Sequence, residues 1–174
     1  RYVDIANVFP NFDADENDPG SYDFSFTDVL LSEMNEKGIK PFYRLGATIE
    51  NFHKIKAYNI YPPKDFSKWA RICEHIIRHY TEGWADGFTH DMPYWEIWNE
   101  PDLDPDDSNN KRTWGGVKTE FFDFYEIAAK HLKDCFPHLK IGGPALAYRE
   151  DWADEFLCEM QKRNVPIDFF SWHI

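Results

Sequence analysis

The sequence predicts an α/β fold in which short parallel strands alternate with amphipathic helices. Two observations support this prediction. Short apolar runs with strand character recur along the chain, at 41–47, 94–98, 139–143 and 167–173. Between them, apolar side chains are spaced by three and four residues, the period of a helix with one buried face. Strands and helices that alternate in this way form βαβ units around a parallel sheet.

The first two expected helices differ in the strength of their pattern. A short apolar stripe precedes Gly38, a residue suited to the left-handed position just past a helix end. The second stripe is clearer, because apolar residues from Trp69 to Tyr80 fall at i, i+3, i+4, i+7, i+8 and i+11. Both segments are therefore expected to cover one face of the sheet.

The later helices and the N-terminal segment follow the same logic. A third stripe covers 121–136 and is stopped by Pro137, which cannot continue a helix. A fourth helix is expected to begin at Asp151, whose side chain can cap its first turn. Residues 1–8 are expected to be the end of a further strand or the loop after it.

Composition excludes several classes of partner. The chain has 174 residues, enough for one domain over 1–174, and 43% of them are hydrophobic. A net charge of −12 argues against nucleic acid and anionic membranes as partners. No apolar run approaches the roughly 18 residues of a membrane span, and no leader peptide is visible. Three widely spaced cysteines, Cys73, Cys135 and Cys158, favour free thiols and a cytoplasmic location.

The most informative segment reads Pro-Tyr-Trp-Glu-Ile-Trp-Asn-Glu-Pro-Asp, at 93–102. It places the carboxyl group of Glu100 at the end of an apolar strand, beside an amide and close to tryptophans. Aromatic faces stack on pyranose rings, an amide holds sugar hydroxyls, and an acid protonates the leaving oxygen. Trp95, Trp98 and Trp172 sit near strand ends, so stacking on sugar is weighed there against ordinary core packing.

Four blocks of the sequence resemble one enzyme family. The run 98–101, Trp-Asn-Glu-Pro, resembles the strand-four signature of the clan A glycoside hydrolases, which are (β/α)8 barrels. The segments 38–46, 140–145 and 165–173 are similar to strands three, five and six of glycoside hydrolase family 39, the β-xylosidase and α-L-iduronidase family. The resemblance implies a truncated (β/α)8 barrel containing about strands two to six, with 1–174 as a partial catalytic domain.

The resemblance also implies roles for individual residues. Glu100 would be the general acid/base of a retaining hydrolase that cleaves β-linked sugars, xylosides above all. Asn99 would hold the sugar beside the scissile bond, and His173 would be a site residue at the end of strand six. Trp98, and Glu50 in the long loop after strand three, are further expected substrate contacts.

The second catalytic carboxylate is the main departure from the family pattern. In clan A the nucleophile is a Glu at the end of strand seven, whereas this sequence ends at Ile174, within the expected strand six. We therefore expect the 174-residue chain alone to be inactive. Two alternatives stay open: another clan A enzyme, such as an endo-acting cellulase or mannanase, and a non-catalytic carbohydrate-binding or structural half-barrel.

Other ligands are not indicated by the sequence. The acidic runs at 13–17 and 102–106 alternate oxygen ligands but lack the Gly and Glu of a calcium-binding loop. His75 and His79 are four residues apart on a helix without a zinc motif, and are expected at the surface. We expect no cofactor and no metal. Uncovered edges of an incomplete barrel would make a homo-oligomer possible.

One ion pair is predicted from strand geometry alone. Glu96 lies on the face of Glu100 but about 13 Å deeper at 3.3 Å per residue, too far to share a reaction centre. Arg44 occupies the corresponding depth of the preceding strand. A buried carboxylate and a buried guanidinium are each costly alone, so we predict that they pair. The alternative is that Arg44 reaches the substrate or a helix.

Overall fold

The computed structural model describes residues 4–47 and 59–173 and contains a parallel sheet of four strands. The strands are β1 (Phe42–Leu45), β2 (Tyr94–Ile97), β3 (Lys140–Leu146) and β4 (Phe170–Trp172), and they neighbour one another in that order. The helices are α1 (Ile5–Val8), α2 (Ser25–Glu36), α3 (Phe66–Thr81), α4 (Lys118–Cys135) and α5 (Glu150–Lys162), with a short 3-10 turn at Pro19–Ser21. The alternation of strands and helices predicted from the sequence is confirmed.

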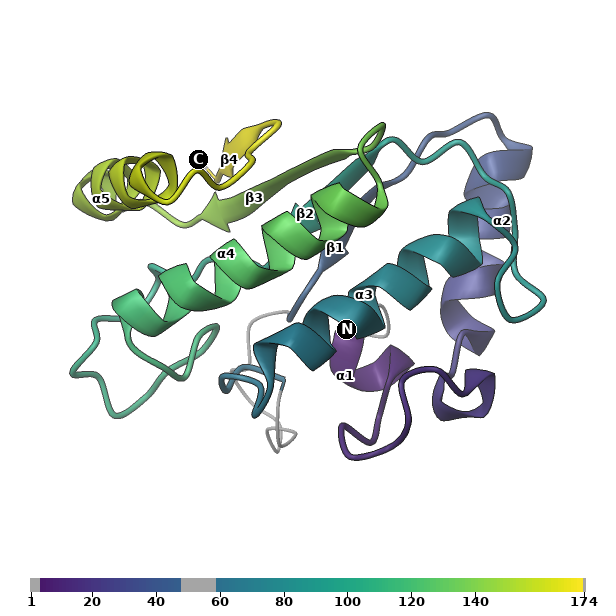
Figure 1. The fold of residues 1–174 in the computed structure, drawn as a ribbon, viewed down its shortest axis with the longest axis horizontal. Helices are drawn as coiled ribbons and strands as arrows, with labels where there is room; N and C mark the ends of the chain where they lie inside the picture. The colour runs from purple at the N-terminus through teal and green to yellow at the C-terminus, as the bar shows by residue number, and fades with distance from the viewer. Residues whose placement is uncertain (1–3, 48–58, 174) are drawn as a thin grey trace.

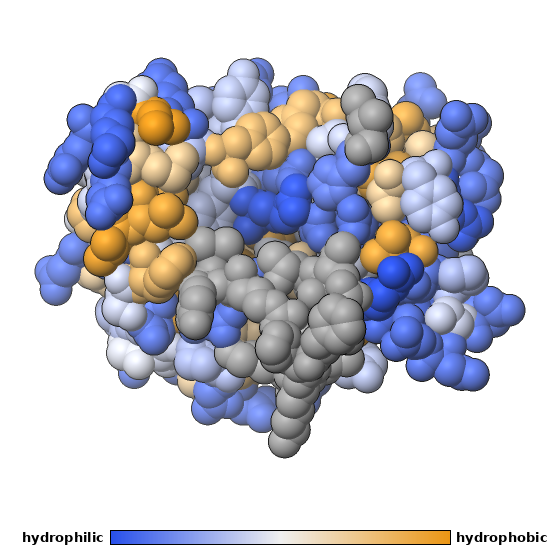
Figure 2. All heavy atoms as spheres, turned by 180° about the vertical axis from the view of Figure 1, so that it is seen from behind, coloured by the Kyte–Doolittle hydropathy of each residue, from blue (hydrophilic) through white to orange (hydrophobic). Residues whose placement is uncertain are grey.

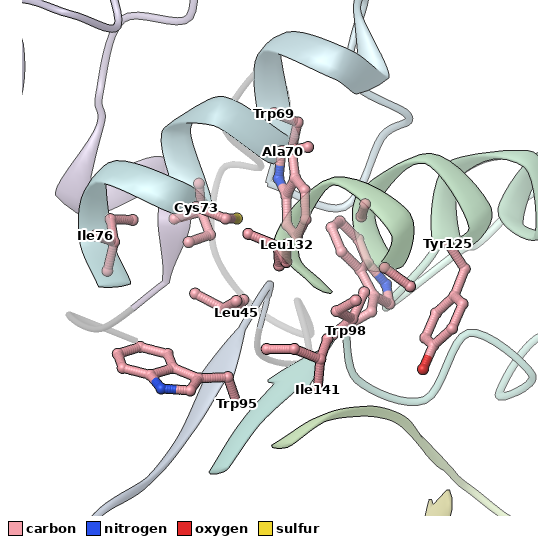
Figure 3. Packing of buried hydrophobic residues seen from close by; sticks show 14 of the residues in the cluster. Leu45, Trp69, Ala70, Cys73, Ile76, Trp95, Trp98, Tyr125, Leu132 and Ile141 are labelled. Atoms are coloured by element: carbon pink, nitrogen blue, oxygen red, sulfur yellow. The ribbon is translucent and has the colours of Figure 1, made fainter. Parts of the chain in front are cut away.

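One face of the sheet carries the hydrophobic core. Helix α4 packs on β2 and β3, α3 packs beside α4, and both cross in front of the strands in Figure 1. Figure 3 shows Leu45 and Ile141 of the strands facing Leu132 of α4, with Trp69 of α3 above them and Trp95 below Ile76 of α3. All these residues are at most 2% exposed. The amphipathic stripes of the sequence therefore form this layer.

The opposite face of the sheet is polar at its centre. Phe42 pairs in register with Tyr94, and Arg44 with Glu96. Because alternate residues of a strand share a face, these four side chains lie on the same side of the sheet. Figure 2 shows the molecule from behind, with hydrophobic patches on either side of a hydrophilic centre. Phe42 and Tyr94 remain 52% and 44% exposed, and their rings stack at 5.7 Å. In a barrel this would be the interior face.

Asp168, just before β4, forms hydrogen bonds with the neighbouring strand β3 and helix α4. Its carboxylate accepts hydrogen bonds from the Ile141 backbone N–H at 2.9 Å and from Lys133 Nζ at 2.6 Å. Burial acts to raise the pKa of Asp168, but these two bonds and the charge of Lys133 hold it below its ordinary value. The ionised carboxylate therefore stabilises the junction of β3, β4 and α4.

Several expected details are wrong. Residues 5–8 form helix α1 rather than strand or loop, and residues 1–3 lie outside the described residues, so the structure shows four of the expected strands two to six. Helix α5 begins one residue before Asp151, which lies in its first turn instead of capping it. His79 is 2% exposed, because its ring stacks on Phe24 at 3.7 Å and bonds Asp28 at 3.0 Å. Within the described part of the chain, no helix is long and apolar enough to cross a membrane.

Candidate active site

The carboxyl-terminal end of β2 carries the residues singled out by the sequence. Trp98 and Glu100 both adopt left-handed backbone conformations, with φ of 70° and 49°. Such angles are strained for residues with side chains and are often found at functional sites. The strain is held by neighbours: the Glu100 N–H donates to Ala145 O at 3.0 Å, and Glu100 O accepts from Thr113 Oγ1 at 2.6 Å.

Trp98 does not offer a stacking face in this structure. Its ring is 1% exposed and packs against Trp69, Trp114 and Phe124 in the core (Figure 3). In a regular strand, residue 98 would share the face of Glu96, but the left-handed φ turns the ring toward the helices. The expected substrate contact is therefore not supported, and the fully buried Trp95 is likewise a core residue.

Two polar atoms beside Trp98 have no hydrogen-bond partner among the residues that the structure describes. Asn99 Oδ1 and Glu100 Oε2 are buried and make no hydrogen bond within the described residues. An unsatisfied buried acceptor costs about 1–3 kcal/mol, so adjacent examples in a native protein call for an explanation. A bound ligand that supplies hydroxyl groups would satisfy both.

The other oxygen of Glu100 is held by His173. Nδ1 of His173 lies 2.5 Å from Glu100 Oε1, and Nε2 lies 3.3 Å from Arg44 Nη2. A guanidinium has no acceptor, so Nε2 must accept and the proton of the neutral imidazole must sit on Nδ1. Arg44 thus selects the tautomer in which His173 donates to Glu100. The structure brings Asn99, Glu100 and His173 together as expected.

The predicted Arg44–Glu96 ion pair is confirmed. Arg44 Nε donates to Glu96 Oε2 at 2.6 Å, and the two residues are register partners of β1 and β2. Ser171 Oγ donates to Glu96 Oε1 at 2.7 Å, so both carboxylate oxygens are bound. The Glu96 side chain is 4% exposed, whereas that of Arg44 is 35% exposed, so only the carboxylate is buried as expected. Through Arg44, this deeper pair is connected to His173.

A cavity of about 510 Å³ opens beside His173. It lies between the loop after β3 and the end of β4, and its lining includes Tyr148, Arg149 and Trp172. Tyr148 is 69% exposed, so its ring, unlike that of Trp98, has a face available for stacking on a sugar. Trp172 is 61% exposed, but alternation along β4 puts it on the face of Phe170, whose ring contacts Phe156 of α5, and not on the face of Ser171 and His173. Sequence reasoning considered Trp172 but missed Tyr148, which lies outside any strand.

Asp102 is a second residue whose role the sequence did not show. Its carboxylate is 0% exposed and accepts backbone N–H bonds from Ala147, Tyr148 and Arg149 at 2.7, 3.1 and 3.0 Å. In the sequence, Asp102 belongs to the acidic run 102–106, which lacks the features of a calcium-binding loop. Asp102 instead ties that loop to the one that carries Tyr148. Glu50, the remaining expected substrate contact, lies outside the described residues.

Comparisons with known proteins agree with this geometry. The family model described as glycosyl hydrolases family 39 matches residues 4–174. A β-xylosidase of Caldicellulosiruptor saccharolyticus is 33% identical over 90% of this chain and 32% of its own length. A β-xylosidase of Geobacillus stearothermophilus is 29% identical over 98% of this chain and 34% of its own.

Solved structures show the same arrangement. A glucosidase from Croceicoccus marinus superposes with a TM-score of 0.79 at 32% identity, over 95% of this chain and 33% of that one. A monomeric β-xylosidase from Caulobacter crescentus superposes with a TM-score of 0.67 at 28% identity, over 87% of this chain and 30% of that one. The chain thus spans about a third of these relatives, as expected for part of a (β/α)8 barrel, and it belongs to glycosyl hydrolases family 39.

Proposed function

We propose that the protein containing this chain is a retaining β-glycosidase of the β-xylosidase type, with Glu100 as its general acid/base. The observation that carries the proposal is a pair of buried oxygens at the end of a parallel strand, Asn99 Oδ1 and Glu100 Oε2, which have no partner in the described part of the chain. Barrel enzymes place their chemistry at this end of the strands. The naming of two relatives as β-xylosidases supports the sugar class.

The contacts of Glu100 assign different tasks to its two oxygens. His173 binds Oε1, which fixes the carboxyl plane, and Oε2 is left to carry the proton that a leaving oxygen needs. In the second half-reaction the same oxygen accepts a proton from water. Double displacement also needs a nucleophilic carboxylate about 5–5.5 Å away, which the family resemblance places on strand seven.

Asn99 would bind the sugar. The side-chain oxygen of Asn99 is an acceptor, so it fits a sugar hydroxyl next to the scissile bond. Glu96 does not compete for the acid role, because Arg44 and Ser171 occupy both of its oxygens. Tyr148, in the loop after β3, would bound the site on the side of the cavity that His173 also lines.

The acid role is tested with Glu100→Gln in the intact protein. Turnover of an aryl β-xyloside with a poor leaving group should fall about 10²–10⁴-fold, the usual contribution of a general acid. The first step on a dinitrophenyl xyloside should fall far less, because that leaving group departs without protonation. Glu33→Gln, on the exposed surface of α2, is the matched control and should leave both rates unchanged. Equal losses on both substrates would contradict the proposal.

The similarity to a glucosidase favours one alternative substrate class. That structure has a TM-score of 0.79 with this chain, so β-glucosides are the competing substrates to compare with β-xylosides. A larger kcat/KM for aryl β-glucosides would move the assignment from xylosidase to glucosidase while leaving the role of Glu100 intact. Binding of sugar without any turnover would favour the carbohydrate-binding alternative.

A further inference from the structure

A cluster of side chains between α3 and α4 lies away from the candidate active site. Glu74 belongs to α3, and His131 and Cys135 lie four residues apart on α4. Helix α4 ends at Cys135, shortly before β3 begins, so the cluster is at the amino-terminal end of the strands. Glu100 lies at the opposite end. In barrels, that amino-terminal side serves stability rather than catalysis.

We propose that Glu74, His131 and Cys135 form a binding site for a zinc-class divalent metal ion. A thiolate, an imidazole and a carboxylate are the usual zinc ligands. The three ligand atoms lie within 4.8 Å of one another. Cys135 Sγ is 3.8 Å from His131 Nε2, and the same nitrogen is 2.7 Å from Glu74 Oε2.

The separations are close to those that zinc requires. With Zn–N of about 2.0–2.1 Å and Zn–S of about 2.3 Å, a tetrahedral site puts nitrogen and sulfur about 3.6 Å apart. The observed sulfur–nitrogen distance of 3.8 Å needs almost no adjustment. The nitrogen and oxygen would have to separate from 2.7 Å to about 3.4 Å, which exchanges a hydrogen bond for two metal bonds. Small side-chain rotations provide this.

The surroundings favour a cation. Arg78 donates to Glu74 Oε1 at 2.8 Å, so the other oxygen, Oε2, faces His131 and could turn to the metal, as hydrogen-bonded metal carboxylates commonly do. Arg78 is itself paired with Glu82, so these three groups carry a net charge of −1. Burial and the charge of Glu74 raise the pKa of the Cys135 thiol, and a bound cation would reverse this effect and stabilise the thiolate.

The metal would act as a cross-link between two helices. His131 is 30% exposed in its side chain, so water can reach the site and supply the fourth ligand. Sequence patterns did not reveal the site, because Glu74 and His131 are 57 residues apart, on different helices, and the ligands form no zinc motif. The proposal does not depend on the glycosidase assignment.

Cobalt spectroscopy of the chelator-treated intact protein tests the proposal without any mutation. One equivalent of Co²⁺ should give tetrahedral visible bands and a thiolate-to-cobalt charge-transfer band, and Zn²⁺ should remove both. Zn²⁺ should also raise Tm. Absence of the charge-transfer band, or binding that saturates only with many equivalents, would overturn the site.

Matched variants test the ligands. Cys135→Ser and His131→Ala should each weaken Zn²⁺ binding by more than about 100-fold in calorimetric titration, beyond the 10–100-fold typical of outer-shell changes. Cys158→Ser and His138→Ala remove the same side chains from exposed positions and should leave the affinity unchanged. If the control variants lose binding, or the ligand variants keep it, the assignment is wrong.

Discussion

Replacing either member of the Arg44–Glu96 pair should destabilise the protein, and the two losses should be unequal. Glu96→Gln preserves the shape of the side chain but removes its charge. The bond from Arg44, at 2.6 Å, then changes from a charge-assisted bond of about 1.5–3 kcal/mol to a neutral one of about 0.5–1.5 kcal/mol. The amide nitrogen also faces Ser171, whose hydroxyl loses its acceptor. The expected total is about 2 kcal/mol.

Arg44→Met should cost more. It leaves the Glu96 carboxylate, with a side chain 4% exposed, bound by Ser171 alone. Losing one partner of a buried pair typically costs about 3–5 kcal/mol. Arg44 is 35% exposed, so water can enter its place, and we expect a value near the lower limit of about 3 kcal/mol. The loss is larger for Arg44→Met because it leaves the charge of the buried Glu96 without its ion-pair partner, whereas Glu96→Gln leaves only the more exposed Arg44 unpaired.

Urea unfolding of the intact protein, followed by tryptophan fluorescence, measures both losses and their coupling. The double variant should lose at least about 1 kcal/mol less than the sum of the single losses, because the two side chains are in contact. The reasoning is refuted if Glu96→Gln costs less than about 0.5 kcal/mol, the range of ordinary surface changes. A larger loss for Glu96→Gln than for Arg44→Met would also refute it.

Four further outcomes are expected. Asp102→Asn should cost about 2–3 kcal/mol in urea unfolding and raise KM, because an amide cannot accept from all three backbone donors. Asp168→Asn should cost about 1–2 kcal/mol at neutral pH. The folded pKa of Asp168 is lowered, so its contribution is full above the unfolded pKa of about 3.9 and fades as pH falls through the folded value; the variant and parent should then converge. Gly143→Ala should reduce Tm more than Gly38→Ala. A Cβ atom added at position 143 would lie 2.6 Å from the backbone oxygen of Ile97, whereas one added at position 38 would have nothing within 4 Å. The 174-residue chain alone should not hydrolyse nitrophenyl xylosides; turnover that disappears with Glu100→Gln would contradict this.

Sequence periodicity predicted the layers of this fold and part of its site. The regular alternation of side chains along β1 and β2 was enough to predict from the sequence that Arg44 pairs with Glu96. The same rule failed at Trp98, because a φ of 70° ends the alternation and turns the ring into the core. Asp102 was missed for a different reason: its partners are backbone groups 45 to 47 residues away, and no side-chain pattern marks them.

The burial of Trp98 has a consequence for how this protein could diversify. The residue before Asn99 and Glu100 is anchored by its indole in the core, where Trp98 Nε1 donates to Thr113 O at 3.0 Å. The carboxyl group of Glu100 is thereby mounted on the scaffold rather than on a loop. The exposed ring of Tyr148 belongs instead to a connecting segment, where changes are better tolerated. If the proposed function holds, natural or laboratory evolution could therefore change which sugar is accepted by remodelling that segment, without moving Glu100.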